Sequence, residues 1–77
     1  MFNYSSLVRP EYRYTYALLN LATGEVHATS CDHASYAVAH LYRMMMHSLR
    51  EARRHGWGTD LRLINASTGE VLLSCAN

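Results

Sequence analysis

Apolar and polar residues alternate between residues 11 and 21, which is the pattern of a half-buried β-strand. One side of this strand would carry Tyr12, Tyr14, Tyr16 and Leu18. The other side would carry Arg13, Thr15, Ala17 and Leu19. Aromatic and β-branched side chains favour extended backbone, so this stretch is predicted to be a strand.

One turn sequence occurs twice in the chain. Asn20–Val26 reads N-L-A-T-G-E-V and Asn65–Val71 reads N-A-S-T-G-E-V, and a Ser-Cys pair follows each copy. In such a turn the Asn side chain can bond to the turn backbone, Gly can adopt the left-handed conformation, and Val restarts a strand. The repeat therefore predicts two β-hairpins, over residues 11–31 and 59–76.

Between the hairpins the hydrophobic period lengthens to three and four residues, and neither Gly nor Pro interrupts it before Gly56. The apolar side of the predicted helix consists of Ala34, Ala37, Val38, Leu41, Met45, Ser48, Leu49 and Ala52. Asp32 is the predicted N-cap, and Gly56 is the predicted left-handed residue at the C-terminal end, followed by apolar Trp57 as in a Schellman motif. We therefore predict a helix over residues 32–56.

The element order β-β-α-β-β predicts an α+β fold, in which one long helix covers one face of an antiparallel four-stranded sheet. With 77 residues the chain is a single domain, 1–77, in which residues 1–10 form an extended arm. Superposing the two repeats predicts a strand face beneath the helix that contains Tyr16, Leu18, Leu61 and Leu63, together with Val26, Ala28, Val71 and Leu73.

The same superposition predicts that Leu19, Ile64 and Leu72 share the opposite face of the sheet, beside Ala17, His27 and Arg62. The sequence offers no second helix to cover this apolar cluster. It is either a set of ordinary surface apolar residues or an interface with a partner or a second copy of the chain, which would make a homodimer.

The outward side of the predicted helix carries a polar stripe at steps of three and four residues. This helix stripe consists of Tyr36, His40, Arg43, His47, Arg50 and Arg54. It would suit an acidic protein surface or phosphates, and it is also compatible with an ordinary solvated helix face. Because the net charge is only +1, a protein or nucleoprotein partner is favoured and nucleic acid alone is the second choice.

The chain shows no motif for catalysis, a cofactor or a metal. His33, His40 and His47 recur every seven residues, about 10.5 Å apart along a helix, which is too far for one zinc ion with bonds near 2 Å. Cys31 and Cys75 lack C-x-x-C spacing and are predicted to be buried thiols. We therefore predict no catalytic residues, no cofactor and no metal site.

The composition and the amino end of the chain indicate the kind of surface and the cellular location that we expect. Charged residues make up 17% of the chain, below the usual value of about 25%, which favours an interacting surface. The amino end has no signal-peptide pattern, and no stretch approaches the roughly 18 apolar residues of a membrane span. We therefore predict a cytoplasmic protein that does not cross a membrane.

A short, intracellular chain with seven Arg and no Lys, built as hairpin-helix-hairpin without a catalytic motif, resembles the small inhibitor proteins of phages and mobile elements, anti-CRISPR proteins among them. The resemblance is one of size and architecture over the whole chain and assigns no functional residue. It implies a non-enzymatic protein that binds a host nucleoprotein complex in the bacterial cytoplasm and blocks it sterically, through the helix stripe or the open sheet face. The alternative is a small nucleic-acid-binding module or dimeric regulator, with Tyr12 and Tyr14 stacking on bases.

Overall fold

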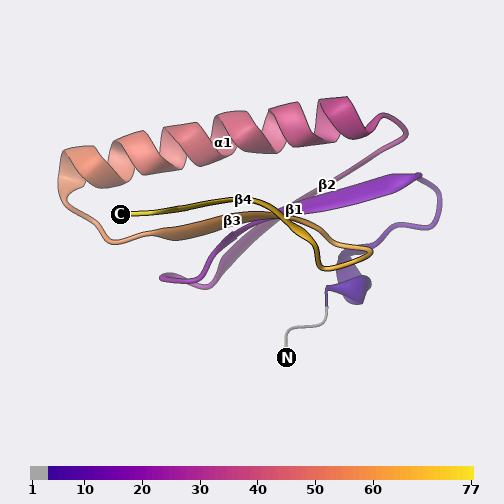
Figure 1. Cartoon of the computed structure of the whole chain (residues 1–77), viewed down its shortest axis with the longest axis horizontal. Coiled ribbons are helices and arrows are strands. Elements are labelled where there is room, and N and C mark those ends of the chain that lie inside the picture. The colour runs from indigo at the N-terminus through magenta and orange to yellow at the C-terminus, as the bar shows by residue number, and fades with distance from the viewer. Residues whose placement is uncertain (1–3) are drawn as a thin grey trace.

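A computed structural model describes residues 4–77 and places two β-hairpins before and after one long helix (Figure 1). The first hairpin is β1 (Tyr14–Asn20) and β2 (Glu25–Cys31), the helix is α1 (Ala34–His55), and the second hairpin is β3 (Asp60–Asn65) and β4 (Val71–Ala76). The strands form one four-stranded antiparallel sheet in the order β2-β1-β3-β4. The predicted α+β class is therefore confirmed.

Both copies of the repeated sequence form the same turn. The side-chain Oδ1 accepts a hydrogen bond from the backbone N–H two residues ahead, at 3.1 Å in Asn20 and 2.9 Å in Asn65. Gly24 and Gly69 have φ angles of 82° and 79°, in the left-handed region that glycine adopts without steric cost. The predicted roles of Asn and Gly in both turns are confirmed.

An approximate two-fold axis perpendicular to the sheet relates the two hairpins. Where β1 pairs with β3, Leu18 lies opposite Leu63, and these two leucines occupy the same position in the two repeats. The flanking pairs exchange in the same way, Tyr16 with Asn65 and Asn20 with Leu61. The sequence repeat is therefore expressed as a symmetry of the sheet around the Leu18–Leu63 pair.

The main core lies between α1 and the two central strands. It consists of Tyr16, Leu18, Leu61 and Leu63 from the sheet and Ala37, Leu41, Met45 and Leu49 from α1. The predicted apolar side of the helix is confirmed, since Leu41 and Met45 are 0% and 1% exposed. Burial of each large side chain in this layer contributes roughly 1.5–3 kcal/mol, so the layer is the main source of stability.

The N-terminal end of α1 differs from the prediction. His33 occupies the N-cap position and makes no side-chain capping bond. The Oδ1 of Asp32, the predicted cap, instead accepts a hydrogen bond from the backbone N–H of Arg13 at 3.0 Å. The carboxylate thus ties the segment before β1 to the end of β2, and the helix begins at Ala34 without it.

The C-terminal end of α1 has the predicted Schellman geometry. Gly56 has a φ of 72°, and the N–H of Trp57 donates to the carbonyl of Ala52 at 2.8 Å. The Trp57 ring stacks on the ring of His55, with centroids 4.5 Å apart. Trp57 stays 59% exposed, so its apolar contact is made at the surface.

The predicted faces of β2 are wrong. In the first hairpin Val26 pairs with Leu19, and His27 pairs with Leu18. Directly paired residues lie on the same face of a sheet. Val26 and Ala28 therefore lie on the face away from α1, whereas His27 lies on the helix side.

A bulge shifts the faces of β4. Val71 lies opposite Ile64, but Leu73 lies opposite Leu63, so Leu72 is an extra residue in β4. Beyond the bulge, Leu73 lies on the helix side, as predicted. Val71 shares the face of Ile64, away from α1, so the prediction that it lies beneath the helix is wrong.

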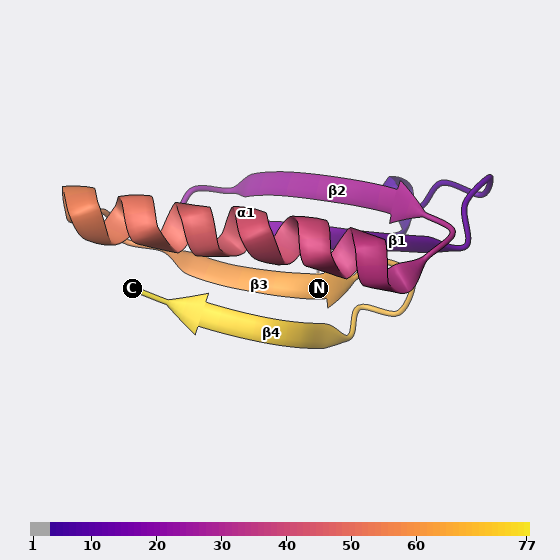
Figure 2. The same cartoon turned by 90° about the horizontal axis from the view of Figure 1, so that it is seen from above.

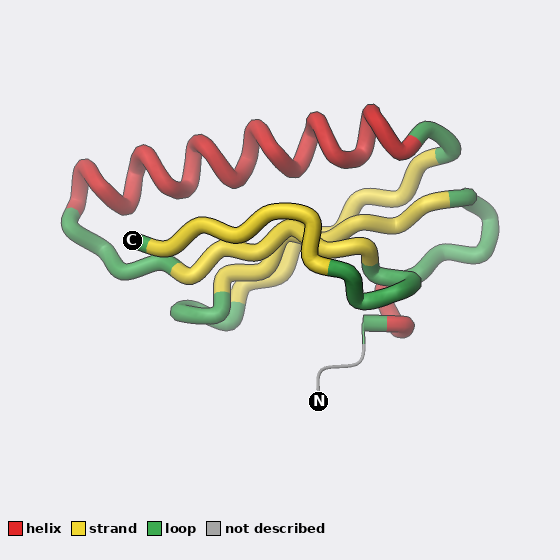
Figure 3. Tube along the Cα trace, viewed as in Figure 1, coloured by secondary structure: helices red, strands yellow, loops and turns green. Residues whose placement is uncertain are grey.

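The N-terminal segment covers the sheet face that we expected to be open (Figure 3). It forms a short 3-10 helix, η1 (Ser5–Leu7), rather than an extended arm. Tyr4 and Leu7 pack against the apolar residues of this face, Ala17, Leu19 and Ile64. The last two are 3% and 2% exposed, so the prediction of an uncovered cluster is wrong for them. Residues 1–3 of the predicted arm lie outside the described residues.

The turn geometry predicts that Gly69→Ala destabilises the fold by roughly 1–2 kcal/mol, because an alanine Cβ is strained at a left-handed φ. Gly58→Ala is the matched control. Gly58 has no positive φ, and the nearest atom to a Cβ there is 4.0 Å away, so stability should be unchanged or about 0.5 kcal/mol higher. Urea unfolding measures both variants. Equal stability of the two would contradict the role given to Gly69.

The packing of η1 predicts that Leu7→Ala lowers the free energy of unfolding by about 1 kcal/mol and increases binding of an apolar dye such as ANS, since the variant opens the cover over Leu19 and Ile64. Ser6→Ala, in the same turn and exposed, should change neither quantity appreciably. If Leu7→Ala behaved like Ser6→Ala, η1 would not be holding this face closed.

Candidate interaction surface

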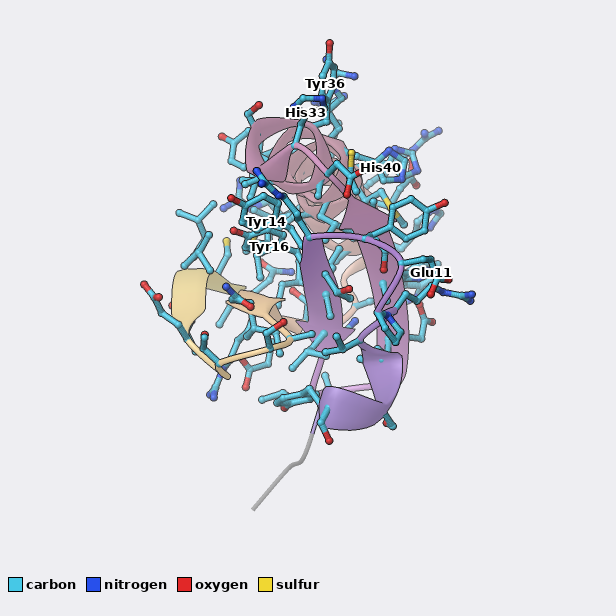
Figure 4. The ribbon with its side chains drawn as sticks, turned by 90° about the vertical axis from the view of Figure 1, so that its right-hand side faces the viewer. Glu11, Tyr14, Tyr16, His33, Tyr36 and His40 are labelled. Carbon is cyan, nitrogen blue, oxygen red and sulfur yellow. The ribbon has the colours of Figure 1, made fainter. Side chains whose placement is uncertain are left out.

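All six residues of the helix stripe are exposed along one side of α1: Tyr36, His40, Arg43, His47, Arg50 and Arg54. The stripe runs for about 27 Å along the helix. Tyr36, near its first turn, is 71% exposed and points away from the sheet (Figure 4). The structure therefore brings the predicted stripe together as one continuous, accessible surface.

The charges of the chain are separated between α1 and the remainder. Four arginines and one glutamate give α1 a formal charge of +3. The rest of the chain has three arginines and five acidic residues, a formal charge of −2, so the net charge of +1 conceals the separation. A partner that binds α1 therefore contacts a basic surface, and the negatively charged remainder of the chain lies behind it.

The arginines of the stripe are available for binding. Within residues 4–77, no ion pair involves Arg43, Arg50 or Arg54. The single acid of α1, Glu51, places its Oε2 3.3 Å from His55 Nε2. The guanidinium donors of the stripe are therefore free to form paired hydrogen bonds with carboxylates or phosphates.

A shallow groove lies beside the stripe near the C-terminal half of α1. Met46 and Leu49 supply its apolar part, and Arg50 and Arg53 supply cationic groups. An apolar floor beside paired cations suits an aromatic or aliphatic side chain next to an acid in a protein partner. The helical period does not predict this groove, although the adjacent Arg53 and Arg54 indicate a basic surface wider than the stripe.

The tyrosines proposed to stack on bases are partly engaged within the protein. The ring of Tyr14 stacks on that of Tyr16, with centroids 6.4 Å apart and planes 23° apart. Tyr16 is buried, and Figure 4 shows both rings on the helix side of the sheet. Tyr12 remains 44% exposed, so it is more accessible to a base than Tyr14.

The three residues predicted to form a sheet-face interface do not form one surface. Leu19 and Ile64 are buried, whereas Leu72 is 37% exposed on β4. Its neighbours Val71 and Leu73 are 49% and 41% exposed. Together Val71, Leu72 and Leu73 form an apolar patch at the edge of the sheet, which we call the β4 patch.

The sequence contained a signal for the β4 patch. The first repeat continues as Val26-His27-Ala28, whereas the second continues as Val71-Leu72-Leu73. This difference between otherwise similar hairpins marks one sheet edge as more apolar than the other. Superposing the repeats assigns residues to the faces of the sheet but does not compare its two edge strands, so the β4 patch was not predicted.

Metal-binding groups do not gather in the part of the chain that the structure describes. Among residues 4–77 there is no group of three His, Cys, Asp or Glu side chains placed to hold an ion. Cys31 and Cys75 are free, partly buried thiols packed against the main core. No helix among these residues is long and apolar enough to span a bilayer.

A scan against protein-family models and searches of curated proteins and solved structures found no match to this chain. The geometry and charge of its surfaces are therefore the basis for a functional proposal.

Proposed function

We propose that this protein is a non-enzymatic interaction protein of the anti-CRISPR type, which binds a host nucleoprotein complex and blocks its action sterically. The separation of charge between α1 and the rest of the chain carries this proposal. The helix stripe would bind an acidic surface of the complex, and the proposed target would place the protein in the bacterial cytoplasm.

The shape of the protein supports steric blocking. Its principal extents are 39 × 27 × 15 Å, and α1 runs along one long, narrow side of this slab (Figure 1). A slab held by this side projects from the partner along its 27 Å extent and occupies the space next to the contact. An inhibitor of this kind needs no chemistry of its own, because it occupies space that a substrate or nucleic acid would need.

A protein component of the complex is favoured over bare nucleic acid as the main contact. The groove formed by Met46, Leu49, Arg50 and Arg53 combines apolar and cationic groups, which a protein side chain uses more fully than a phosphate does. The negative body behind α1 would also be repelled by a second strand or an adjacent duplex.

Binding to nucleic acid alone is the second candidate, because His and Arg alternate along the stripe and Tyr36 lies at one end of it. A module of this kind would hold the backbone through arginine and stack a base on the exposed tyrosine. It would then use the same surface for a different partner class.

The combined substitutions Arg43→Glu and Arg50→Glu should reduce capture of the partner complex by about tenfold or more, since two unpaired cations in the centre of the stripe become anions. The measurement is quantitative mass spectrometry of proteins and nucleic acid retained from host lysate by the immobilised protein. Arg9→Glu with Arg13→Glu is the control, because it changes net charge equally at exposed sites outside α1. Equal capture by both double variants would remove the helix stripe as the binding surface.

A salt titration separates the two candidate functions. We expect the protein to show little affinity for a short DNA duplex or single strand even at low salt, because only a few phosphates could be contacted at once. Binding that is tight at low salt and falls steeply as salt rises would instead establish the nucleic-acid module. Fluorescence anisotropy with labelled oligonucleotides makes this measurement.

A further inference from the structure

β4 is an open edge strand with unused backbone hydrogen-bonding groups. Among residues 4–77 it pairs only with β3. Just beyond β4, Thr59 and Asn77 exchange both backbone hydrogen bonds, at 3.2 and 3.0 Å. Bonded and non-bonded pairs alternate along an antiparallel ladder. The peptide groups of Ser74 and Ala76 therefore point away from β3, toward the open edge.

The side chains along this edge do not protect it. Val71–Ala76 contains no charged residue and no proline, and the β4 patch is exposed on both faces of the strand. Seen from above, α1 runs along the middle of the sheet, with β2 on one side of it and β4 on the other (Figure 2). Soluble proteins ordinarily protect such an edge by charge, proline or a covering segment.

The opposite edge of the sheet is protected, although it belongs to the equivalent hairpin. β2 carries Glu25 and His27, with Glu25 Oε2 3.6 Å from His27 Nε2. The edges of the repeat therefore differ in their ability to accept another strand, and only β4 has an uncharged, apolar surface.

We propose that β4 pairs antiparallel with β4 of a second copy of this chain, so that one sheet continues through a two-fold symmetric dimer. Self-pairing suits the charge pattern, because Glu70, the charged residue adjoining β4, would lie at opposite ends of the joined strands in the two copies. It would also bury the β4 patch of each copy against the other. The inference is independent of the proposed function, because it uses no residue of the helix stripe.

A contact along one short strand is smaller than the interfaces of permanent dimers. The dimer is therefore weak and dissociates on dilution.

The symmetry of this dimer decides where the helices lie. An axis perpendicular to the sheet already relates the two hairpins inside one chain, around the Leu18–Leu63 pair. The same kind of axis between two β4 strands would keep both α1 helices on one face of the extended sheet, antiparallel to each other. The dimer would then present two helix stripes to the same side.

Sedimentation velocity from micromolar to millimolar concentration tests the association. Wild type should rise from 8.8 kDa toward twice that mass. Ser74→Pro removes an outward N–H without breaking the β3 ladder, and Val71→Lys replaces an apolar residue of the β4 patch by a charged one, which natural edge strands use to prevent pairing. Each should raise the dimer dissociation constant about tenfold or more. Val26→Lys, at the equivalent position on β2, should leave it unchanged.

Hydrogen exchange of the wild-type protein tests the site itself and does not depend on how the variants fold. The amides of Ser74 and Ala76 should become protected as concentration rises, because they gain hydrogen bonds only in the dimer. A protein that remains monomeric throughout the range would overturn the proposal. So would a dimer in which these amides stay unprotected, since that result would mean association through another face.

Discussion

The structure depends on the pairing of β1 with β3, which brings Leu18 opposite Leu63 beneath α1. These strands are distant in sequence, and α1 alone connects their hairpins. The same pairing creates the apolar surface on which Leu41 and Met45 pack, so sheet and helix stabilise one another. A two-stranded hairpin is marginally stable in water by itself, whereas two hairpins joined under a helix bury enough apolar surface to persist.

The local elements were predictable because their signals are local. The period of the helix, the left-handed glycines and the alternation of β1 each depend on residues close in sequence, and all are confirmed. The faces were predicted less well because they depend on register. Val26 and Val71 were misplaced because each pairs with a residue on the face away from α1. The bulge at Leu72 then puts Leu73 on the face opposite to that of its counterpart Ala28, and nothing in the repeated N-x-x-T-G-E-V turn indicates an extra residue. Similarly, η1 is too short to produce a periodic pattern, so its cover over Leu19 and Ile64 is a tertiary contact that propensity does not encode.

The same distinction applies to the candidate surfaces. The helix stripe follows from helical geometry, so its exposed residues were identified together from sequence, although their partner was not. The β4 patch depends on strand order, because Leu73 and Val71 are exposed only where no further strand pairs with β4 and α1 lies over the other strands. Assigning residues to the two faces of the sheet does not show that its two edges differ in polarity. His27 in the first repeat and Leu72 in the second occupy equivalent positions. This difference indicates that one sheet edge is more apolar only once both β2 and β4 are known to be edge strands.

The two edges of the sheet differ although its two hairpins are related by symmetry. This difference allows one molecule to pair through β4 and to bind a partner through the helix stripe at the same time. The core fixes α1 over the central strands, η1 closes the opposite face, and β4 is left at one side of both layers. Contacts along β4 lie in the plane of the sheet, whereas contacts with the helix stripe lie above it. Pairing through the edge therefore leaves the arginines of α1 accessible, and binding through α1 leaves the outward peptide groups of β4 free. A weak dimer of this geometry would raise the effective concentration of one stripe once the other is bound, and the gain would depend on whether the partner offers two acidic sites at a matching separation.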